Sequence, residues 1–506
     1  MSCLAPFASF LLSTERIFQS TRCKFQWCSP HTASIHILDD DSLLNVFYLY
    51  RPFLLGEDQD DGARLIGGER QWADERWWYT LAQVCQRWRT LIHGSASYLH
   101  LCLVCTYGTP VADMLAYSPP LPLVIDYFDR DHDINAEDEE GILLALEQRD
   151  RICRIRFQMP VLRGPNVQRL IMAINEEYPV LEYLIMLPST DDNSAALTLP
   201  ETLQAPHLRH LALRGFVLPT GSRLLTTAAG IVTLCLLISP ASAYFQPNTL
   251  LRWISLMPQL ETLFIDFLFP VSKRDVERQL IHTPIMTHVT LPSLRWFAFT
   301  GISPYMEAVV HRITTPRLEK LDIRFFKQLT FSIPHVLHFM RTTENLTFDR
   351  AKFEFSRDDV HVEVYPREET EYTLSAYVLC WHLDWQVSSV AQIFNSLGQI
   401  FSTVEHLTLE HEVHTRSSEE HNEVDRTEWR KLLGSFSNVK TLRVDNGLIK
   451  ELSRSLRLDD GDDPLELLPE LQELTYSGSG NAGDAFASFI DARQNAGRTV
   501  VLTRHR

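Results

Sequence analysis

The stretches Ala205–Leu213 (APHLRHLAL) and Thr315–Ile323 (TPRLEKLDI) share the pattern that decides the fold. In the first stretch, apolar residues stand at three fixed places, Leu208, Leu211 and Leu213. The last two are two residues apart, so both point to the same face of a β-strand, and the first lies on the turn that leads into it. One such unit cannot bury its apolar face alone, whereas a stacked neighbour can bury it.

Eight segments of the chain follow this pattern. In chain order they are YPVLEYLIM from Tyr178, APHLRHLAL from Ala205, MPQLETLFI from Met257, LPSLRWFAF from Leu291, TPRLEKLDI from Thr315, FSTVEHLTL from Phe401, FSNVKTLRV from Phe436 and LPELQELTY from Leu468. Six of the eight have proline two residues before the first apolar position, although only 26 of the 506 residues are proline. Proline stops the preceding element and fixes an extended entry. We expect degenerate repeats in the long gaps, for example at Thr343–Asp349.

Strand-like and helix-like segments also alternate before the first of these repeats. The expected strands are Tyr98–Cys105, Leu121–Phe128 and Arg151–Gln158, and the expected helices are Pro110–Tyr117, Glu137–Gln148 and Asn166–Glu177. A helix at Asp484–Asn495 and a strand at Thr499–Thr503 are expected to close the array. This alternation is typical of stacked β-α units. The sequence therefore predicts an α/β protein with an irregular leucine-rich-repeat-like solenoid over residues 98–506.

Two helices are expected ahead of the solenoid. The first spans residues 40–50, where Asp40, Asp41 and Ser42 offer capping oxygens and Arg51-Pro52 ends the helix. The second spans Asp74–His93, and Gly94 ends it. Their apolar residues fall at helical spacing, so the helices must pack on each other and on something further. An acidic loop over residues 56–71 separates them.

These two segments carry a resemblance to a known family. Ile37–Phe47 (ILDDDSLLNVF) resembles the opening of an F-box, although Asp39 stands where a proline is usual. Leu81–Arg89 (LAQVCQRWR) resembles the closing helix with its Val-Cys-x-x-Trp signature. The whole chain resembles the fungal F-box proteins with divergent leucine-rich repeats. The resemblance covers residues 35–117 well and the rest by pattern only.

The resemblance implies a role and a set of binding residues. F-box helices dock on the Skp-family adaptor of a cullin–RING ubiquitin ligase, and the repeats present a target protein to the ligase. Carried over by position, the residues expected at or under the adaptor interface are Leu38, Leu43, Leu44, Phe47, Leu81, Val84 and Trp88. The alternative is that these residues only pack the helices together. The implied domains are an F-box-like module at 35–97 and the repeats at 98–506, with residues 1–34 unassigned.

Composition narrows the classes of partner. The formal net charge of −17 disfavours nucleic acid, because phosphate contacts need clustered Lys and Arg. The longest apolar run, Ile231–Ile238, is only about strand length, so no membrane partner is expected. Nine cysteines are spread sparsely from Cys3 to Cys380, which favours a reducing compartment and hence the cytoplasm or nucleus.

Several segments contain residues of the types that bind metal ions. Asp129–Glu140 has the oxygen spacing of a calcium loop, but Ile134 stands where the turn needs glycine, and an acidic loop that caps the next helix is preferred. A group of Cys23, Cys28, His31 and His36 has tighter spacing than ordinary zinc fingers, and the Cys102 and Cys105 pair reads as core. His406, His411 and His414 read as solvated loop histidines.

No sequence pattern points to catalysis. The chain has no Gly-rich phosphate loop, no nucleophile elbow and no HExxH pair. We therefore expect no cofactor, no metal and no enzymatic activity. Three functions remain open: a ligase substrate receptor, a repeat scaffold without a ligase role, and an enzyme with an unfamiliar site.

Overall fold

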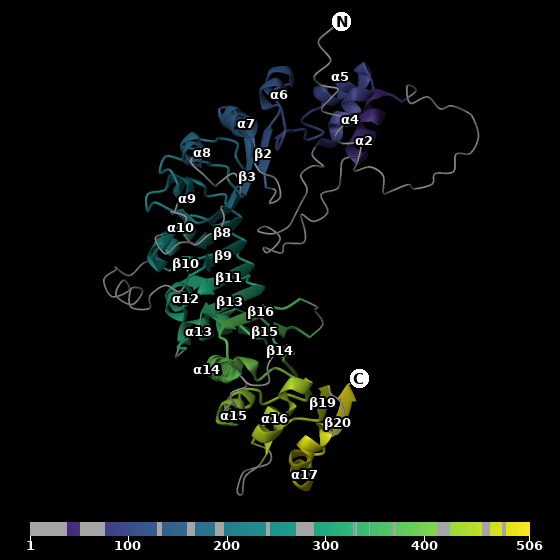
Figure 1. Ribbon diagram of the computed structural model, residues 1–506, viewed down its shortest axis with the longest axis vertical. Coiled ribbons are helices and arrows are strands. Elements are labelled where there is room, and N and C mark those ends of the chain that lie inside the picture. The colour runs from purple at the N-terminus through teal and green to yellow at the C-terminus, as the bar shows by residue number, and fades with distance from the viewer. Residues whose placement is uncertain are drawn as a thin grey trace, which may run out of the picture.

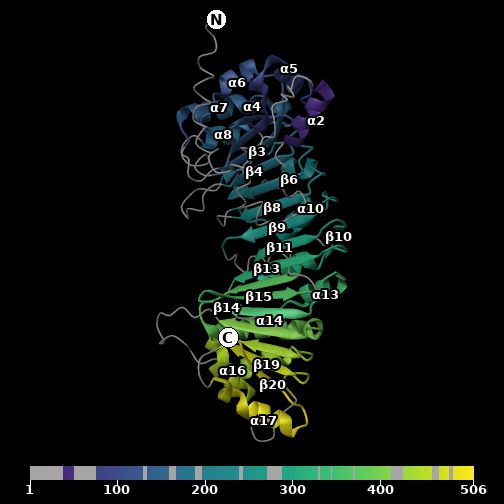
Figure 2. The ribbon, with the colours of Figure 1, turned by 90° about the vertical axis from the view of Figure 1, so that its right-hand side faces the viewer.

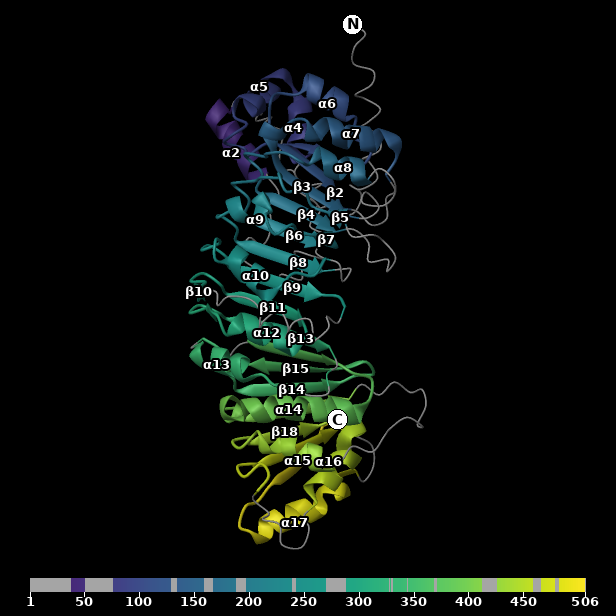
Figure 3. The same ribbon diagram turned by 90° about the vertical axis from the view of Figure 1, so that its left-hand side faces the viewer.

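The computed structural model describes residues 38–50, 76–128, 134–158, 167–187, 197–238, 243–269, 288–326, 328, 331–343, 345–367, 371–411, 426–457, 466–477 and 482–505. Within them, the protein is a mixed α/β chain with one large, mostly parallel sheet of sixteen strands. The strands stack along an arc, with the helices on its outer side and the open face of the sheet on its inner side (Figures 1 and 2). Figure 3 shows the helical side.

The strands of the large sheet are β1 Leu103–Cys105, β2 Leu123–Tyr127, β3 Ile152–Gln158, β4 Tyr183–Leu187, β6 His210–Arg214, β8 Thr233–Ile238, β9 Thr262–Phe267, β11 Trp296–Gly301, β13 Lys320–Phe326, β14 Arg350–Phe355, β15 Asp359–Tyr365, β16 Leu374–Leu379, β17 His406–His411, β18 Thr441–Val444, β19 Glu473–Ser477 and β20 Val501–His505. Two small parallel pairs join β5 (Leu197–Thr198) to β7 (Phe216–Val217) and β10 (Val289–Thr290) to β12 (Ile313–Thr314).

The α-helices are α2 Asp40–Tyr50, α4 Trp77–Val84, α5 Gln86–Gly94, α6 Val111–Tyr117, α7 Ala136–Leu146, α8 Val167–Ala173, α9 Arg223–Thr227, α10 Pro247–Ile254, α12 Ser303–Val310, α13 Pro334–Thr342, α14 Leu383–Phe401, α15 Arg426–Gly434, α16 Ile449–Leu456 and α17 Ala487–Asn495. Short 3₁₀ turns lie at η4 Arg149–Arg151, η6 Asn446–Leu448 and η7 Ala482–Phe486.

The solenoid predicted from the repeats is confirmed. All eight repeated segments enter strands of the large sheet, namely β4, β6, β9, β11, β13, β17, β18 and β19. The apolar run Ile231–Ile238 supplies β8, which fills the first long gap between β6 and β9. Equivalent leucines pair across neighbouring strands, as Leu184 does with Leu211. Each repeat therefore buries the apolar face of the next.

The leading prolines occupy tight turns. In six repeats, including Ala205–Leu208 and Thr315–Leu318, the first leucine donates its N–H to the carbonyl oxygen three residues earlier at 3.0–3.4 Å. Proline is the second residue of each such turn, where its fixed φ suits the turn geometry. The residue after the first leucine links its repeat to the next one. For example, the carbonyl oxygen of Arg295 accepts the N–H groups of both Glu319 and Lys320 in the following repeat.

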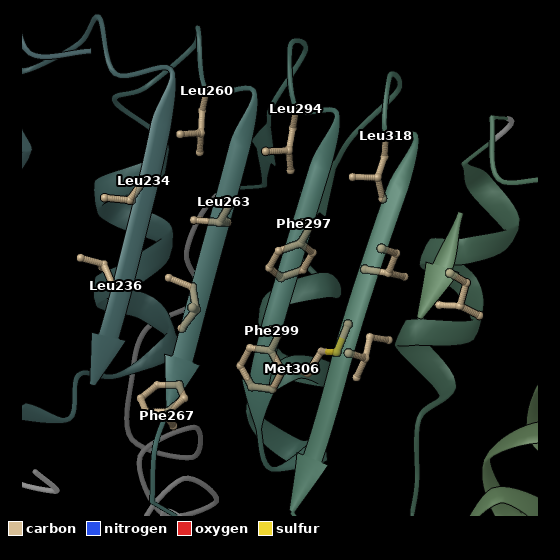
Figure 4. Packing of buried hydrophobic residues seen from close by; sticks show 14 of the residues in the cluster. Leu234, Leu236, Leu260, Leu263, Phe267, Leu294, Phe297, Phe299, Met306 and Leu318 are labelled. Atoms are coloured by element: carbon tan, nitrogen blue, oxygen red, sulfur yellow. The ribbon is translucent and has the colours of Figure 1, made fainter. Parts of the chain in front are cut away.

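The hydrophobic core lies between the sheet and the helices that cover it (Figure 4). Leu260, Leu294 and Leu318 lie on successive turns and are fully buried, and Leu263 and Phe297 lie below them on the strands. Burying one such side chain contributes about 1.5–3 kcal/mol, so the array is stable only when the units are stacked.

An antiparallel insertion interrupts the second long gap. Strand β14 pairs in parallel with β17, β15 runs antiparallel to both of its neighbours, and β16 returns to pair in parallel with β13. The prediction of a repeat at Thr343–Asp349 is therefore wrong in register, because the strand begins only at Arg350. Ala351 pairs with Leu407, the second apolar residue of its repeat. The first apolar residue of the β14 unit, which lies three positions earlier on the turn, is therefore Phe348.

Two predictions ahead of the solenoid need correction. The single helix expected at Asp74–His93 is two helices, because Cys85 adopts an extended backbone (φ −160°, ψ 168°) and its Sγ accepts from the N–H of Trp88 at 3.5 Å. The strand expected at Tyr98–Cys105 is only β1, since the residues before it form turns. The helices expected near residues 110, 137 and 167 and the C-terminal helix and strand are confirmed to within a few residues.

Candidate functional site

Helices α2, α4 and α5 close the N-terminal end of the arc (Figure 1). Leu43 and Phe47 of α2 are buried, and the Phe47 ring packs on Trp88 of α5. The indole N–H of Trp78 donates to the carbonyl oxygen of Cys102, just before β1, at 3.2 Å. These side chains belong to the same hydrophobic core as the repeats. The helices and the solenoid are thus packed without a break.

The start of α2 is fixed by Asp39 and Arg87. The Asp39 carboxylate accepts the N–H of Ser42 at 2.7 Å, and this hydrogen bond holds the pKa of Asp39 below its ordinary value. Asp39 therefore caps the helix, and not Asp40, Asp41 or Ser42 as expected. Arg87 donates to the Leu38 carbonyl oxygen and to Asp40 Oδ1, both at 2.7 Å.

The seven residues expected at the adaptor interface divide into three groups. Leu43, Phe47 and Trp88 are buried between the helices. Leu44 and Leu81 are half-buried against the core. Leu38 and Val84 are exposed, Val84 to 57%. Only the last group is free to meet a partner without rearrangement, and the half-buried pair borders it.

An exposed apolar stripe on α2 lies outside the seven residues expected at the interface. Val46, Leu49 and Tyr50 are exposed, Leu49 to 72%, and their spacing of three and four residues places them on one side of the helix. Tyr50 lies beside Trp77 of α4, with ring centroids 6.4 Å apart. We call Leu38, Val46, Leu49, Tyr50 and Val84 the outer helical face. The sequence shows that α2 is apolar on both sides, but it does not show which side stays exposed.

The open face of the sheet is the second candidate surface (Figure 2). Its side chains form three rows that cross the strands. The first row is Arg154, Tyr183, His210, Thr233, Thr262, Trp296 and Lys320. The middle row is Arg156, Ile185, Ala212, Cys235, Phe264, Ala298, Asp322, Ser375, Glu363, Lys352, Thr408, Arg443 and Thr475. The third row is Arg214, Leu237, Asp266, Thr300, Arg324, Tyr377, His361, Glu354 and Glu410.

The middle row changes character along the arc. From β4 to β11 it is apolar, and Ile185, Ala212 and Cys235 form a small cluster separate from the main core. From β13 onward it is polar and charged, beginning at Asp322. The open face therefore offers two chemically different halves to a partner.

Stacked rings make the polar half rigid. Tyr377 lies between the Arg324 guanidinium, 4.6 Å from its ring centroid, and the His361 ring, 3.7 Å away at an interplanar angle of 9°. His361 Nε2 is 3.1 Å from Ser375 Oγ. A surface whose side chains are already held in place loses little conformational entropy when it binds.

Two titratable groups on the open face have strongly shifted pKa values. Burial raises the pKa of Asp322 to about 6, although the Trp296 indole N–H donates to its carboxylate at 2.5 Å. Burial lowers the pKa of His210 to about 4, so its ring is neutral at pH 7 and stacks on Tyr183 with centroids 4.3 Å apart. Both groups bind neighbouring side chains, so the arrangement supports recognition by stacking and hydrogen bonding.

Some of the segments compared with metal sites lie in the described part of the chain. There, no group of three or more His, Cys, Asp or Glu side chains could hold a metal ion. Asn135 and Asp138 form a capping box at the start of α7, as the acidic-loop interpretation expects. Cys105 is buried and Cys102 half-buried, and neither forms a disulfide. The Cys23, Cys28, His31 and His36 group, Asp129–Asp133 and His414 lie outside the described residues.

Among known proteins, the likeness found is distant. No protein-family model matches the chain, and no curated protein matches it. Among solved structures it is similar to the leucine-rich repeat-containing protein LegL7 from Legionella pneumophila, with 11% sequence identity and a TM-score of 0.26, over 77% of this chain and 97% of that one. Among the described residues, no helix is both long and apolar enough to cross a membrane.

Proposed function

We propose that this chain is a non-enzymatic adaptor, the substrate receptor of a Skp–cullin–F-box ubiquitin ligase. In this role α2, α4 and α5 dock on the Skp-family adaptor, and the open face of the sheet binds a target protein. One molecule that holds both partners raises their effective concentration for each other, so no chemistry is required of the chain itself. Such a complex would act in the cytoplasm or nucleus.

The observation that carries the proposal is the two-sided character of α2. Its inner side, Leu43 and Phe47, fills the chain's own core, and its outer side still exposes Leu49 and Tyr50. A helix on the surface of a folded protein usually has polar residues on its outer side. An apolar stripe on a short helix is the form in which a helix binds a hydrophobic groove of a partner.

The alternative is a protein-interaction scaffold of leucine-rich-repeat type without a ligase role. It is favoured by the burial of Leu43, Phe47 and Trp88, because three residues of the expected interface are used for internal packing. In this case the helices only cap the first repeat, as terminal units of solenoids do. The open face would still bind a protein.

Co-purification with a Skp-family adaptor tests the proposal. Co-expressed wild-type chain is expected to co-purify with the adaptor, and Leu49→Asp is expected to lose it. Leu44→Asp is a poorer variant, because Leu44 packs against the core and its loss can unfold the helices. If the wild-type chain fails to co-purify where an ordinary F-box protein succeeds, the scaffold alternative replaces the ligase role.

A further inference from the structure

The tryptophans of the chain are distributed unevenly between core and surface. Of the eight that lie in the described residues, Trp381 and Trp385 alone are exposed, to 74% and 44%. Both stand where β16 ends and α14 begins. Exposed tryptophan is costly in water and is enriched at the centres of protein interfaces. The junction of β16 and α14 is therefore a candidate binding surface.

The backbone that carries Trp381 is rigid. The N–H of Cys380 donates to the Asp358 carbonyl oxygen at 3.0 Å, in the turn between β14 and β15. The buried Gln386 side chain donates to the carbonyl oxygens of both Ser356 and Cys380, each at 2.9 Å. The start of α14 and the hairpin turn are therefore one unit, and the indoles are presented from a fixed base.

This base continues the polar half of the open face. Along β16 the odd-numbered Tyr377 and Leu379 are half-buried on the open side, whereas Val378 and Cys380 are buried in the core. Trp381 follows two residues after Leu379, just beyond the end of β16. The stacked rings of Tyr377 and His361 thus lead toward it.

Three carboxylates belong to the two segments that meet at this junction. Asp358 lies in the hairpin turn, Asp359 begins β15, and Asp384 lies between the two tryptophans in the sequence, in the first turn of α14. Within the described part of the chain, none of the three makes an ion pair with Lys or Arg; Asp359 Oδ1 accepts from Ser356 Oγ at 2.8 Å. The cation in the same segment is Arg357, and His382 packs edge-on against Trp385 at 4.9 Å. The local charge is therefore negative.

We propose that Trp381 and Trp385, with the carboxylates of Asp358, Asp359 and Asp384, form the docking site for an arginine- or lysine-containing segment of a partner protein. An indole face attracts a cation more strongly than the other aromatic rings do, and nearby carboxylates add to the attraction. The site rests on the proposed function only in taking the solenoid to be the part that binds a target.

Fluorescence anisotropy with the full chain tests this site. The probe is a fluorescein-labelled octapeptide with three arginines separated by serine and valine, and the matched control peptide has glutamate in place of each arginine. We expect saturable binding of the arginine peptide only, weakened about tenfold by Trp381→Ala. Tyr117→Ala on α6, where Tyr117 is 79% exposed, is the control variant and is expected to change binding less than twofold.

Two outcomes would overturn the site. One is equal binding of the glutamate peptide, and the other is equal affinity of the Trp381→Ala and Tyr117→Ala chains for the arginine peptide. Asp358→Asn adds a charge arm: its loss of affinity should be present at low salt and shrink at high salt. Trp381→Ala is also expected to keep co-purification with the Skp-family adaptor, so failure of either proposal is seen independently of the other.

Discussion

Phe47 of α2 and Trp88 of α5 meet edge to face, with ring centroids 4.9 Å apart and ring planes at 64°. Both side chains are buried, so this pair joins the first and last helices of the N-terminal unit. The edge-to-face geometry is the favoured one for aromatic pairs. The inner packing of these helices is therefore separate from the outer helical face of Leu38, Val46, Leu49, Tyr50 and Val84.

This separation predicts opposite effects for two substitutions. Trp88→Ala removes a buried ring and is expected to lower the free energy of unfolding by about 3–5 kcal/mol. Leu49→Asp changes an exposed side chain and is expected to alter it by less than about 0.5 kcal/mol. Urea unfolding followed by circular dichroism measures both. Equal destabilisation by the two variants would show that Leu49 is part of the core.

Asp322 gives the chain a predictable pH dependence. Burial raises its pKa from 3.8 to about 6, so between these values the native state keeps a proton that the unfolded chain has released. The free energy of unfolding therefore falls as the pH rises through this range. Asp322→Asn should remove this pH dependence. Between pH 4 and pH 7, its free energy of unfolding should increase by about 2 kcal/mol relative to that of wild type. Parallel pH profiles of the two chains would contradict the shift.

Glu307 connects two neighbouring repeats. Its carboxylate, carried on α12, accepts the N–H groups of His335 and Val336 at 2.9 and 2.8 Å, where α13 begins. Glu307→Ala leaves these donors without an acceptor and is expected to cost about 1–3 kcal/mol in unfolding free energy. The matched control is Glu319→Ala, because the Glu319 carboxylate pairs with the exposed Arg295. This substitution should lower the free energy of unfolding by less than about 1 kcal/mol.

The repeat turns predict a contrast between proline and serine. Pro316→Ala should destabilise the chain by about 0.4–1 kcal/mol, because proline restricts the unfolded state. Ser402 holds the equivalent place after α14 with φ −61°, which proline could adopt, but its N–H donates to the Gly398 carbonyl oxygen at 3.0 Å. Ser402→Pro should therefore destabilise the chain despite matching the other repeats. A higher melting temperature for Ser402→Pro would contradict this account.

The sequence predicted the solenoid because each repeat contains its own turn and its own buried pair of residues. It did not predict the reversal at β15, because apolar alternation such as that of Val360, Val362 and Val364 marks a strand without giving its direction. The break at Cys85 was also missed. A thiol is a weak acceptor, and the apolar spacing on either side of Cys85 is continuous with one helix.

The candidate site was predicted only in part. Helices lie close to where the apolar spacing predicts them, but three of the seven residues expected at the interface, Leu43, Phe47 and Trp88, are buried between these helices. The outer helical face could not be separated from the inner side by periodicity, because both sides of α2 are apolar. The rows of the open face depend on the register of distant strands, which only the folded chain provides.

The most direct test of the central claim is the affinity of the purified chain for a purified Skp-family adaptor, measured by isothermal titration calorimetry. The account predicts one-to-one binding by wild type that is weakened at least tenfold by Leu49→Asp and by Val84→Asp and is unchanged by Tyr117→Ala. Absence of binding by the folded wild-type chain, or equal affinity of all four chains, would contradict it.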